Sequence, residues 1–284
     1  MKKRTIDPQL DLLLPSLTDM PLRDQRETME RPFFSLSKRK RLKPIEYTSP
    51  DFSVFVTVSA NPRFGMATIW DSDVLIWAAS ALHQMKREGV NDLPRTLHFM
   101  PYDLLRTIGR ATGGREYQLL RDALARLQST TVVTNIRGTK RARHRQFSWL
   151  DSWDDVIEPG DAQSRGMSIT LADWCFEGII QAGGVLSIDP EYFAITGGRE
   201  RWLYRVARKH AGNQEDGFAI SMRTLFEKSG AEGTFRRFNF EMRKLVEKNA
   251  LPSHAIFMEA NGAGDVLLRM IRRKNAVTHA WLES

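Results

Sequence analysis

The amino-acid sequence predicts an α+β protein built of two tandem winged-helix domains with small antiparallel β-hairpin wings. One pattern, a short strand, a short helix, a glycine-containing turn and a longer amphipathic helix, occurs twice in the chain. Each copy is followed by two strand-like runs joined by a loop. The 284 residues also carry a formal net charge of +8 and a pI near 9.7, and such an excess of positive charge attracts nucleic acid or an anionic membrane.

The two copies of this pattern align without a gap at a constant offset of 121 residues, which places Gly109 on Gly230. The same offset places Arg115 on Arg236, at the start of each longer helix. A short helix, a turn and a second helix form a helix-turn-helix, which lays its second helix in a DNA major groove. Two copies therefore predict a protein that contacts two successive faces of the groove.

The N-terminal region divides into a tail and a basic arm. Residues 1–32 are polar and contain several prolines, and they predict a flexible N-terminal tail. Residues 38–43 follow, with five basic side chains in six positions. Such a run is either a solvated arm or an arm that lies along DNA phosphates and adds affinity without sequence information. We include it in the first winged-helix domain, which is predicted to span residues 33–157.

A strand and a helix are predicted before the first helix-turn-helix. Apolar residues alternate between Phe52 and Val58, as on one face of a strand. Residues 71–85 then carry an apolar helical stripe that must be buried, with Asp71 as the helix N-cap. This helix is predicted to pack under the helix-turn-helix of the first domain.

The first wing is predicted directly after the first longer helix. Residues 131–138 are rich in β-branched side chains, and residues 146–150 contain two aromatic side chains, so both runs are strand-like. The loop region between them contains cations and no acid, which favours contact with phosphate or the minor groove, and a flexible basic loop is the alternative. The predicted contacts are Arg137, Lys140, Arg141, Arg143 and Arg145.

The charge changes sign after this wing. Residues 151–161 contain five acids and no base, and they predict the junction between the two halves. The second domain, with its linker, is therefore expected at residues 158–284. A second and less basic wing is predicted at residues 255–273, because an Asn-Gly turn signal at Asn261 lies between two apolar runs.

A helix with glycine at both ends is predicted within residues 196–212, with Arg201 and Arg205 mostly exposed. Its first residues, Thr-Gly-Gly-Arg-Glu, repeat the string at residues 112–116, although the two strings are out of register with the longer repeat. We favour a glycine turn before a helix start as the explanation. The alternative is a phosphate that rests on the amides of the helix N-terminus.

Periodicity indicates which side chains of the longer helices face DNA. In the second of them, Phe238 and Met242 belong to the buried stripe, and basic side chains remain outside. The N-terminal end of such a helix points into the groove, where arginine suits guanine and asparagine suits adenine. The predicted base contacts are Arg236, Arg237 and Asn239, with Arg243 and Lys244 on phosphate, and Arg115, Gln118 and Arg121 facing outward on the first helix.

Catalysis finds little support in the sequence. The six histidines lack metal-ligand spacing, the nucleotide-binding glycine loop is absent, and Asp71 with Asp73 is better explained by helix capping than by metal binding. We therefore expect no enzymatic activity, no cofactor and no metal. The single cysteine, Cys175, excludes an internal disulfide and favours a reducing compartment. No apolar run is long enough to span a bilayer, so no membrane partner is expected.

Six long and ordered motifs extend together from about Arg31 to the C-terminus. They are the segments at residues 32–38, 65–80, 102–105, 108–114, 134–137 and 196–212. In these motifs the sequence resembles the replication initiator protein A family of plasmid initiators, whose wider relatives are the tandem winged-helix initiators of iteron-controlled plasmids.

The resemblance implies binding to repeated sites (iterons) in the double-stranded DNA of a plasmid origin, help in opening that duplex, and recruitment of the host initiator and replicative helicase. It places the protein in the bacterial cytoplasm, associated with plasmid or nucleoid. Related initiators also repress their own promoters as dimers, so the resemblance allows a homodimer and a part in copy control. The residues alone predict only a double winged-helix DNA binder. A transcriptional repressor of the same fold is the main alternative, and a nicking enzyme is a more distant one.

Overall fold

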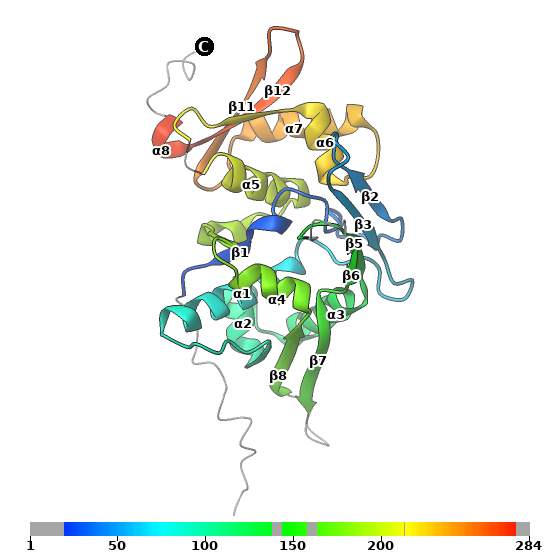
Figure 1. The fold of residues 1–284 in the computed structure, drawn as a ribbon, viewed down its shortest axis with the longest axis vertical. Helices are drawn as coiled ribbons and strands as arrows, with labels where there is room; N and C mark the ends of the chain where they lie inside the picture. The colour runs from blue at the N-terminus through cyan, green and yellow to red at the C-terminus, as the bar shows by residue number, and fades with distance from the viewer. Residues whose placement is uncertain (1–19, 138–143, 158–163, 213, 277–284) are drawn as a thin grey trace, which may run out of the picture.

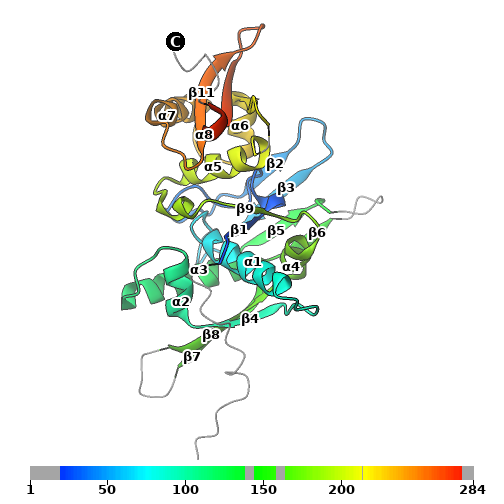
Figure 2. The ribbon, with the colours of Figure 1, turned by 90° about the vertical axis from the view of Figure 1, so that its left-hand side faces the viewer.

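The computed structural model describes residues 20–137, 144–157, 164–212 and 214–276. Helices and small antiparallel sheets alternate along the chain, which confirms the predicted α+β class. Two units follow each other along the long axis of the molecule, as Figure 1 shows, and Figure 2 gives the same arrangement from the side. No helix within these described ranges is both long and apolar enough to cross a membrane.

Both units contain the same succession of elements: a helix, a strand, two helices and a pair of strands. The strands form three-stranded antiparallel sheets of equivalent order, β4-β8-β7 in the first unit and β10-β12-β11 in the second. The elements of the first unit are α1 (Ser72–Arg87), β4 (Thr96–Phe99), α2 (Pro101–Thr107), α3 (Gly114–Ser129), β7 (Leu150–Ile157) and β8 (Ser164–Leu171). Those of the second are α5 (Gly198–His210), β10 (Phe218–Ser221), α6 (Met222–Ser229), α7 (Phe235–Lys248), β11 (His254–Ala260) and β12 (Val266–Arg272), and α8 (Arg273–Ala276) follows.

The repeat in the sequence corresponds to this repeat in the structure. The turns between the paired helices contain Gly109 with φ 67° and Gly230 with φ 59°, in the left-handed region that glycine adopts at low cost. The turn at Gly230 also packs tightly, because a Cβ there would lie 2.6 Å from Cβ of Pro32. Arg41 donates from Nη1 to the carbonyl oxygen of Gly230 at 2.6 Å. The predicted glycine turns are therefore confirmed.

The predicted hairpin after α3 is confirmed, because β5 (Thr131–Thr134) pairs antiparallel with β6 (Arg145–Phe147). It is not the counterpart of the second hairpin, however, because it does not pair with β4. It joins β2 (Ile45–Thr48) and β3 (Phe55–Ser59) in a separate four-stranded sheet of order β2-β3-β5-β6. The hairpin that pairs with β4 is β7–β8. In sequence, the first unit therefore contains an insertion between α3 and its hairpin that the second unit lacks.

The acidic stretch predicted to join the two halves is instead mostly the outer strand of this hairpin. Ile169 of β8 lies opposite both Leu97 of β4 and Trp153 of β7. β8 supplies the buried face with Met167, Ile169 and Leu171, while the acids of β7 are mostly turned toward solvent. A charged strand is stable here because its partner strand, β8, provides the apolar contacts.

The last part of the predicted flexible tail is built into the fold. β1 (Arg23–Gln25) pairs antiparallel with β9 (Val185–Ser187), and the 3₁₀ turn η2 (Arg26–Thr28) follows β1. Met29 is fully buried. The partner strand β9 belongs to the segment between the two units, which also forms α4 (Asp173–Ile180) and the 3₁₀ turn η3 (Pro190–Ala194).

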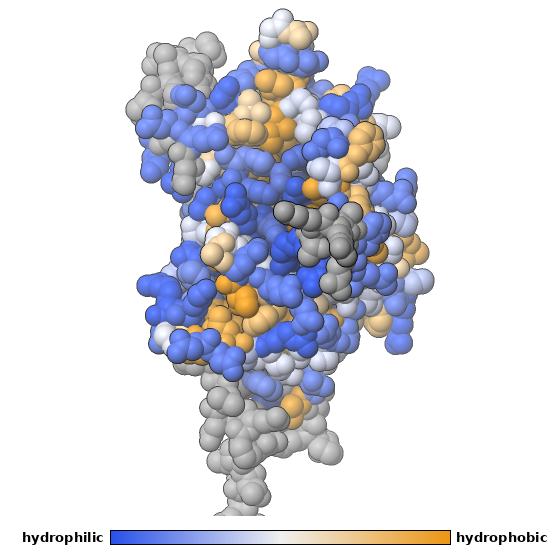
Figure 3. All heavy atoms as spheres, in the orientation of Figure 1, coloured by the Kyte–Doolittle hydropathy of each residue, from blue (hydrophilic) through white to orange (hydrophobic). Residues whose placement is uncertain are grey.

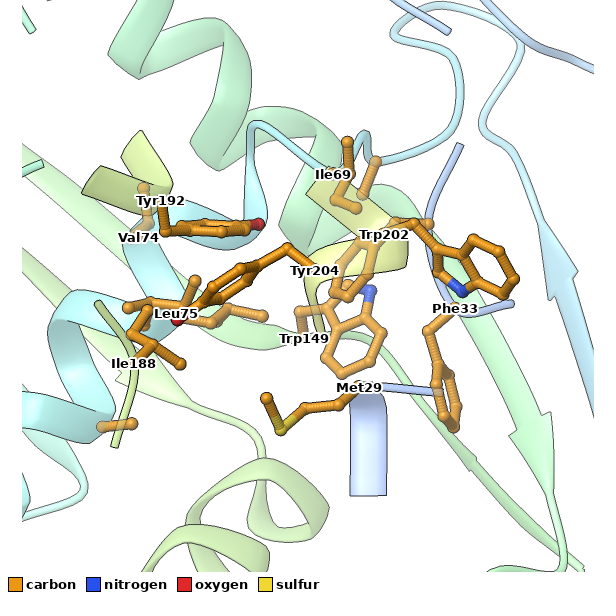
Figure 4. Close-up of a cluster of buried hydrophobic side chains, with 14 of the residues drawn as sticks. Met29, Phe33, Ile69, Val74, Leu75, Trp149, Ile188, Tyr192, Trp202 and Tyr204 are labelled. Carbon is orange, nitrogen blue, oxygen red and sulfur yellow. The ribbon is translucent and has the colours of Figure 1, made fainter. Parts of the chain in front are cut away.

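One hydrophobic core runs through both units. Figure 4 shows part of it, where Phe33 and Met29 of the N-terminal segment lie near Trp149, Tyr204 and Trp202. The rings of Phe33 and Trp149 meet edge to face at a centroid distance of 5.6 Å, an arrangement that aromatic rings favour. The two units therefore do not have separate cores, and the N-terminal segment contributes to the shared one.

Buried ion pairs also connect the units. Asp73 of α1 accepts from Arg201 of α5 at 2.7 Å and from Arg110, beyond the glycine of the first turn, at 3.0 Å. Arg205 of α5 binds Asp24 of β1 with Nε to Oδ2 at 2.6 Å. Arg201 and Arg205, expected to be mostly exposed, are 3% and 2% exposed because these remote acids neutralise them inside the protein.

Candidate nucleic-acid interface

Helix α7 is an amphipathic helix with well-defined ends. Thr234 caps its N-terminus, because the Thr234 side chain accepts a hydrogen bond from the backbone N–H of Arg237 at 3.3 Å. Asn249 ends it in the left-handed conformation. Phe238 and Met242 are buried on one side, as the periodicity predicts. The helix is therefore held by its inner face, and its outer face is available for contacts.

The outer face of α7 is basic. Arg236, Arg237, Arg243 and Lys244 are all exposed. Of these four, Arg237 has a carboxylate neighbour among the described residues, with its Nε 2.9 Å from Glu241 Oε1. The other three cations remain free of ion pairs within the described ranges. An outward cationic helix face of this kind is suited to phosphates and to the acceptor atoms of guanine.

Asn239 differs from these four cations. Its side chain is only partly accessible, and its Oδ1 atom is buried without a hydrogen-bond partner in the described part of the chain. Recognition of adenine by asparagine uses both the oxygen and the nitrogen of the amide. The contact predicted for Asn239 therefore requires that its side chain turn outward when DNA binds.

Helix α3 carries fewer free cations. Arg115 and Gln118 are exposed, and Gln118 donates to Asp122 at 2.9 Å. Arg121 is held against the β7 strand, where its Nε donates to Asp155 Oδ2 at 2.7 Å. Arg121 is thus a neutralised side chain that stabilises the hairpin, while Arg115 keeps its charge toward solvent.

A cleft of about 500 Å³ lies beside α3 and is lined on one side by Lys38, Arg39 and Lys40 of the basic arm. Leu119 and Glu116 of α3 line it as well. The ammonium group of Lys38 lies 5.0 Å from the ring centroid of Trp70, and the Lys40 ammonium donates to the carbonyl of Arg63 at 2.9 Å. The arm is therefore fixed against the first unit, beside its longer helix.

Two of the cations predicted for the first wing have structural roles. Arg137 is 15% exposed at its side chain, binds Glu27 at 2.9 Å and covers the ring of Trp174 at 4.1 Å. Arg145 binds Glu177 of α4 at 2.7 Å. The assignment of Arg137 to DNA is corrected, because its guanidinium group is paired with Glu27 of the N-terminal segment and packs on Trp174. Lys140, Arg141 and Arg143 lie outside the described residues.

The two identical glycine strings have different surroundings. Gly198, at the start of α5, is packed so closely that a Cβ would lie 2.1 Å from the carbonyl oxygen of Leu36. Gly114, at the start of α3, has no atom within 4 Å of such a Cβ. The packing explains the glycine at 198 without a ligand, and the N-terminus of α3 remains open toward solvent.

The tyrosines, one of which would serve as the nucleophile of a nicking enzyme, differ in their surroundings. Burial raises the pKa of Tyr204 to about 12, and burial also raises the pKa of the fully buried Tyr192. Tyr102 is exposed, and its hydroxyl accepts from Arg106 at 3.1 Å. Asp71 stands at the N-cap position of α1 as predicted, but its side chain makes no capping hydrogen bond and binds Arg126. Asp73 binds Arg201.

The face seen in Figure 1 is largely hydrophilic, with apolar residues gathered over β11–β12 and over α1 and α4 (Figure 3). Helices α3 and α7 lie toward the opposite side, which is on the left in Figure 2. Two exposed apolar side chains on these helices, Leu119 and Phe240, were not predicted from the sequence. Their common offset of 121 residues was a signal that could have found them.

The fold and this surface define a class of two-unit α+β proteins in which each unit presents one exposed helix. Two solved structures of domains 2 and 3 of RctB have this fold. One superposes with a TM-score of 0.60 at 13% identity, covering 86% of this chain and 96% of the other. The second has a TM-score of 0.54 at 12% identity, covering 87% and 98%.

Sequence comparison then assigns the family. The chain matches the family described as Replication initiator protein A over residues 23–256. It is also 32% identical over 237 residues to a protein of Wigglesworthia glossinidia brevipalpis whose name assigns it, provisionally, to replication, and the match covers 82% of this chain and 84% of that one. The chain belongs to the replication initiator protein A family, and its role is that of a replication initiator.

Proposed function

We propose that each unit is a winged helix, with α3 and α7 as the recognition helices. The support is the shared order of elements, in which a strand and two helices precede a hairpin that pairs with the strand. In winged-helix and other helix-turn-helix proteins, the second helix of the pair enters the major groove. The wing of the first unit is then β7–β8, and the wing of the second is β11–β12.

We further propose that the protein binds repeated sites in the double-stranded DNA of a plasmid origin. The observation that carries this proposal is the outer face of α7, which presents four exposed cations on a helix anchored by its opposite side. Exposed cations of this kind supply affinity for phosphates and discrimination at base edges. Lys38 and Lys40 lie close to the first recognition helix, where a phosphate backbone would pass.

The remaining steps follow from the family role. Bound at the origin, the protein promotes opening of the adjacent duplex and recruits the host initiator and the replicative helicase, without catalysing a reaction itself. Control of its own promoter, and with it of plasmid copy number, would use the same DNA-binding surface. In this proposal the protein acts in the bacterial cytoplasm on plasmid DNA.

The test is a nuclease footprint of the full chain on DNA that flanks its own gene, repeated across a salt series. We expect protection of evenly spaced direct repeats and distortion of neighbouring A·T-rich DNA. The variant Arg236→Ala should lose the protected pattern. A matched control is Arg87→Ala, which removes an exposed arginine at the far end of α1.

The outcomes separate the possible functions. A single protected inverted repeat over a promoter would replace the initiator by a repressor. Protection without any pattern, lost at moderate salt, would leave only a general DNA-binding protein, because affinity without sequence information comes from phosphates alone.

A further inference from the structure

One side chain on α7 is out of place on a basic, solvent-facing surface. Phe240 is 58% exposed, whereas Phe238 and Met242, two residues before and after it, are 1% and 0% exposed. Phe240 therefore contributes little to the core that holds the helix. A single exposed apolar residue needs no explanation by itself. Phe240 needs one because it lies among cationic side chains on the outer face of α7.

Phe240 lies in the middle of the basic face. Arg236 and Arg237 precede it by four and three residues, and Arg243 and Lys244 follow it by three and four. Residues at these spacings are neighbours on a helix surface. The ammonium group of Lys244 lies 4.5 Å from the centroid of the Phe240 ring. The aromatic ring is thus framed by four cationic side chains, of which Arg237 is paired with Glu241.

The equivalent position in the first unit also carries an exposed apolar side chain. The offset of 121 residues places Leu119 of α3 on Phe240, and Leu119 is 39% exposed. In both helices an arginine stands four residues earlier, Arg115 and Arg236. Leu119 lies at the edge of the cleft beside the basic arm, so the two positions are equivalent in the repeat while their surroundings differ.

The framing charges decide what this apolar group contacts. A hydrophobic protein surface or a lipid tail would have to accept four cations at the rim of the contact. A DNA major groove presents negative phosphates at its edges and one apolar group on its floor, the C5 methyl of thymine. Phenylalanine is among the side chains that contact this methyl group.

We propose that Phe240 contacts the methyl group of a thymine in the recognition site and so helps to select the sequence, with Leu119 in the same role at a second site position. The inference rests on the proposed function, because it requires α7 to enter the major groove. It adds a base identity, thymine at the position facing Phe240, that arginine contacts with guanine do not provide.

The test uses the full chain and a duplex that carries its recognition site, obtained by footprinting or by selection from random duplexes. Each thymine is replaced in turn by deoxyuridine, which lacks only the methyl group. Wild-type protein should bind about fourfold more weakly when one particular thymine is replaced, because burial of one methylene-sized group is worth about 0.8 kcal/mol. Phe240→Ala should bind the unmodified duplex more weakly and should not respond to that replacement.

The matched control is Phe52→Ala, which removes an exposed phenylalanine from the β2–β3 turn, away from α7. This variant should keep the full wild-type response to deoxyuridine. Phe240→Leu should keep part of it. Since Phe240 is largely exposed, its variants should fold, and circular dichroism spectra that match the wild type would establish this.

Two results would overturn the inference while leaving the proposed function in place. One is specific binding by the wild type with no sensitivity to any deoxyuridine. The other is an unchanged deoxyuridine response in Phe240→Ala. Absence of any specific binding by the wild type to unmodified DNA would instead overturn the proposed function, and the inference with it.

Discussion

The two exposed helices, α3 and α7, occupy equivalent positions in the repeat but use their arginines differently. On α7, Arg236 and Arg243 are exposed and have no ion-pair partner within the described ranges. On α3, Arg121 is neutralised by Asp155, and Arg126 is held by both carboxylate oxygens of Asp71 at 2.8 Å. The exposed helix of the second unit therefore keeps these two arginines unpaired within the described ranges, whereas the first unit uses much of its charge for its own structure.

The difference arises from acids outside the helices. Asp155 belongs to the hairpin that packs beside α3, and Asp71 stands at the start of α1. In the second hairpin, Glu259 binds Arg269 of the neighbouring strand at 2.6 Å. Counting arginines on a helix thus overstates the charge available to DNA, because a remote carboxylate can neutralise a side chain that periodicity places outside.

The largest expected effect is on the stability of the contact between the two units, which the ion pair of Asp73 with Arg201 helps to hold. Asp73→Asn leaves Arg201 buried without a counter-charge, and we expect a loss of about 3–5 kcal/mol in the free energy of unfolding. Urea denaturation measures it. Asp92→Asn, at an exposed position, is the control. The double variant Asp73→Leu with Arg201→Met removes both charges and should recover much of the loss. If it were as unstable as Asp73→Asn, the uncompensated charge of Arg201 would not be the cause of the loss.

The next largest effect is expected from acid, which should destabilise the second unit before the first. Burial lowers the pKa of His254, at the start of β11, to about 4 from an ordinary value of 6.5. The folded protein keeps this ring neutral while the unfolded chain protonates it, so stability is full above pH 6.5 and falls as the pH drops toward 4. The loss approaches about 3 kcal/mol.

Urea denaturation at pH 7, 5.5 and 4.5 checks this prediction. His254→Phe should be less sensitive to pH over the interval between 6.5 and 4.5. Hydrogen bonds and ion pairs with Lys209, His210 and Lys228 hold the pKa of Glu30 far below its ordinary value despite its burial, so its contribution is lost only at lower pH. Amide hydrogen exchange that rises in β7 before β11 on acidification would contradict an early loss in the second unit.

The affinity for DNA should then depend more on α7 than on α3. Arg236→Ala should weaken specific binding by about 10- to 100-fold, since a paired contact to guanine is worth ~1–3 kcal/mol. Arg115→Ala, its equivalent on α3, should have a smaller effect. Titration of both variants on specific and unrelated duplexes measures the difference. Equal losses on the two duplexes would remove base recognition from the role of Arg236.

The smallest expected effect is on the salt dependence of binding. Each lost phosphate contact should reduce the slope of log affinity against log salt by about 0.9, and we expect this for Arg243→Ala and for Lys244→Ala. Arg121→Ala should leave the slope unchanged, because Asp155 already neutralises that arginine. A slope that changes equally for Arg121 and Arg243 would remove the contrast between the helices.

Local pattern predicted part of this molecule well. The glycine turns and the buried stripe of α7 depend on neighbouring residues, so periodicity and the repeat were sufficient to find them. The four-stranded sheet could not be predicted in this way, because Val132 of β5 pairs with Val58 of β3, far away in the sequence. The same reason explains Arg205, whose partner Asp24 is 181 residues away.

The candidate site shows the same division. The exposure of Arg236, Arg237, Arg243 and Lys244 follows from the 3.6-residue period and was predicted correctly. Arg137 follows a strand-like run and resembles a loop cation in the sequence, yet its side chain packs on Trp174. No local pattern distinguishes a cation that contacts an aromatic ring from one that faces solvent.

The N-terminal segment has a consequence for how such proteins diversify. Asp24 and Glu30 come from the first 32 residues, yet they neutralise Arg205, Lys209 and Lys228 of the second unit. Exchange of C-terminal halves between two relatives would therefore separate these cations from the acids that neutralise them inside the fold. Under the proposed function, a new target sequence would then arise through substitutions on the outer face of α7 and not through recombination of whole units.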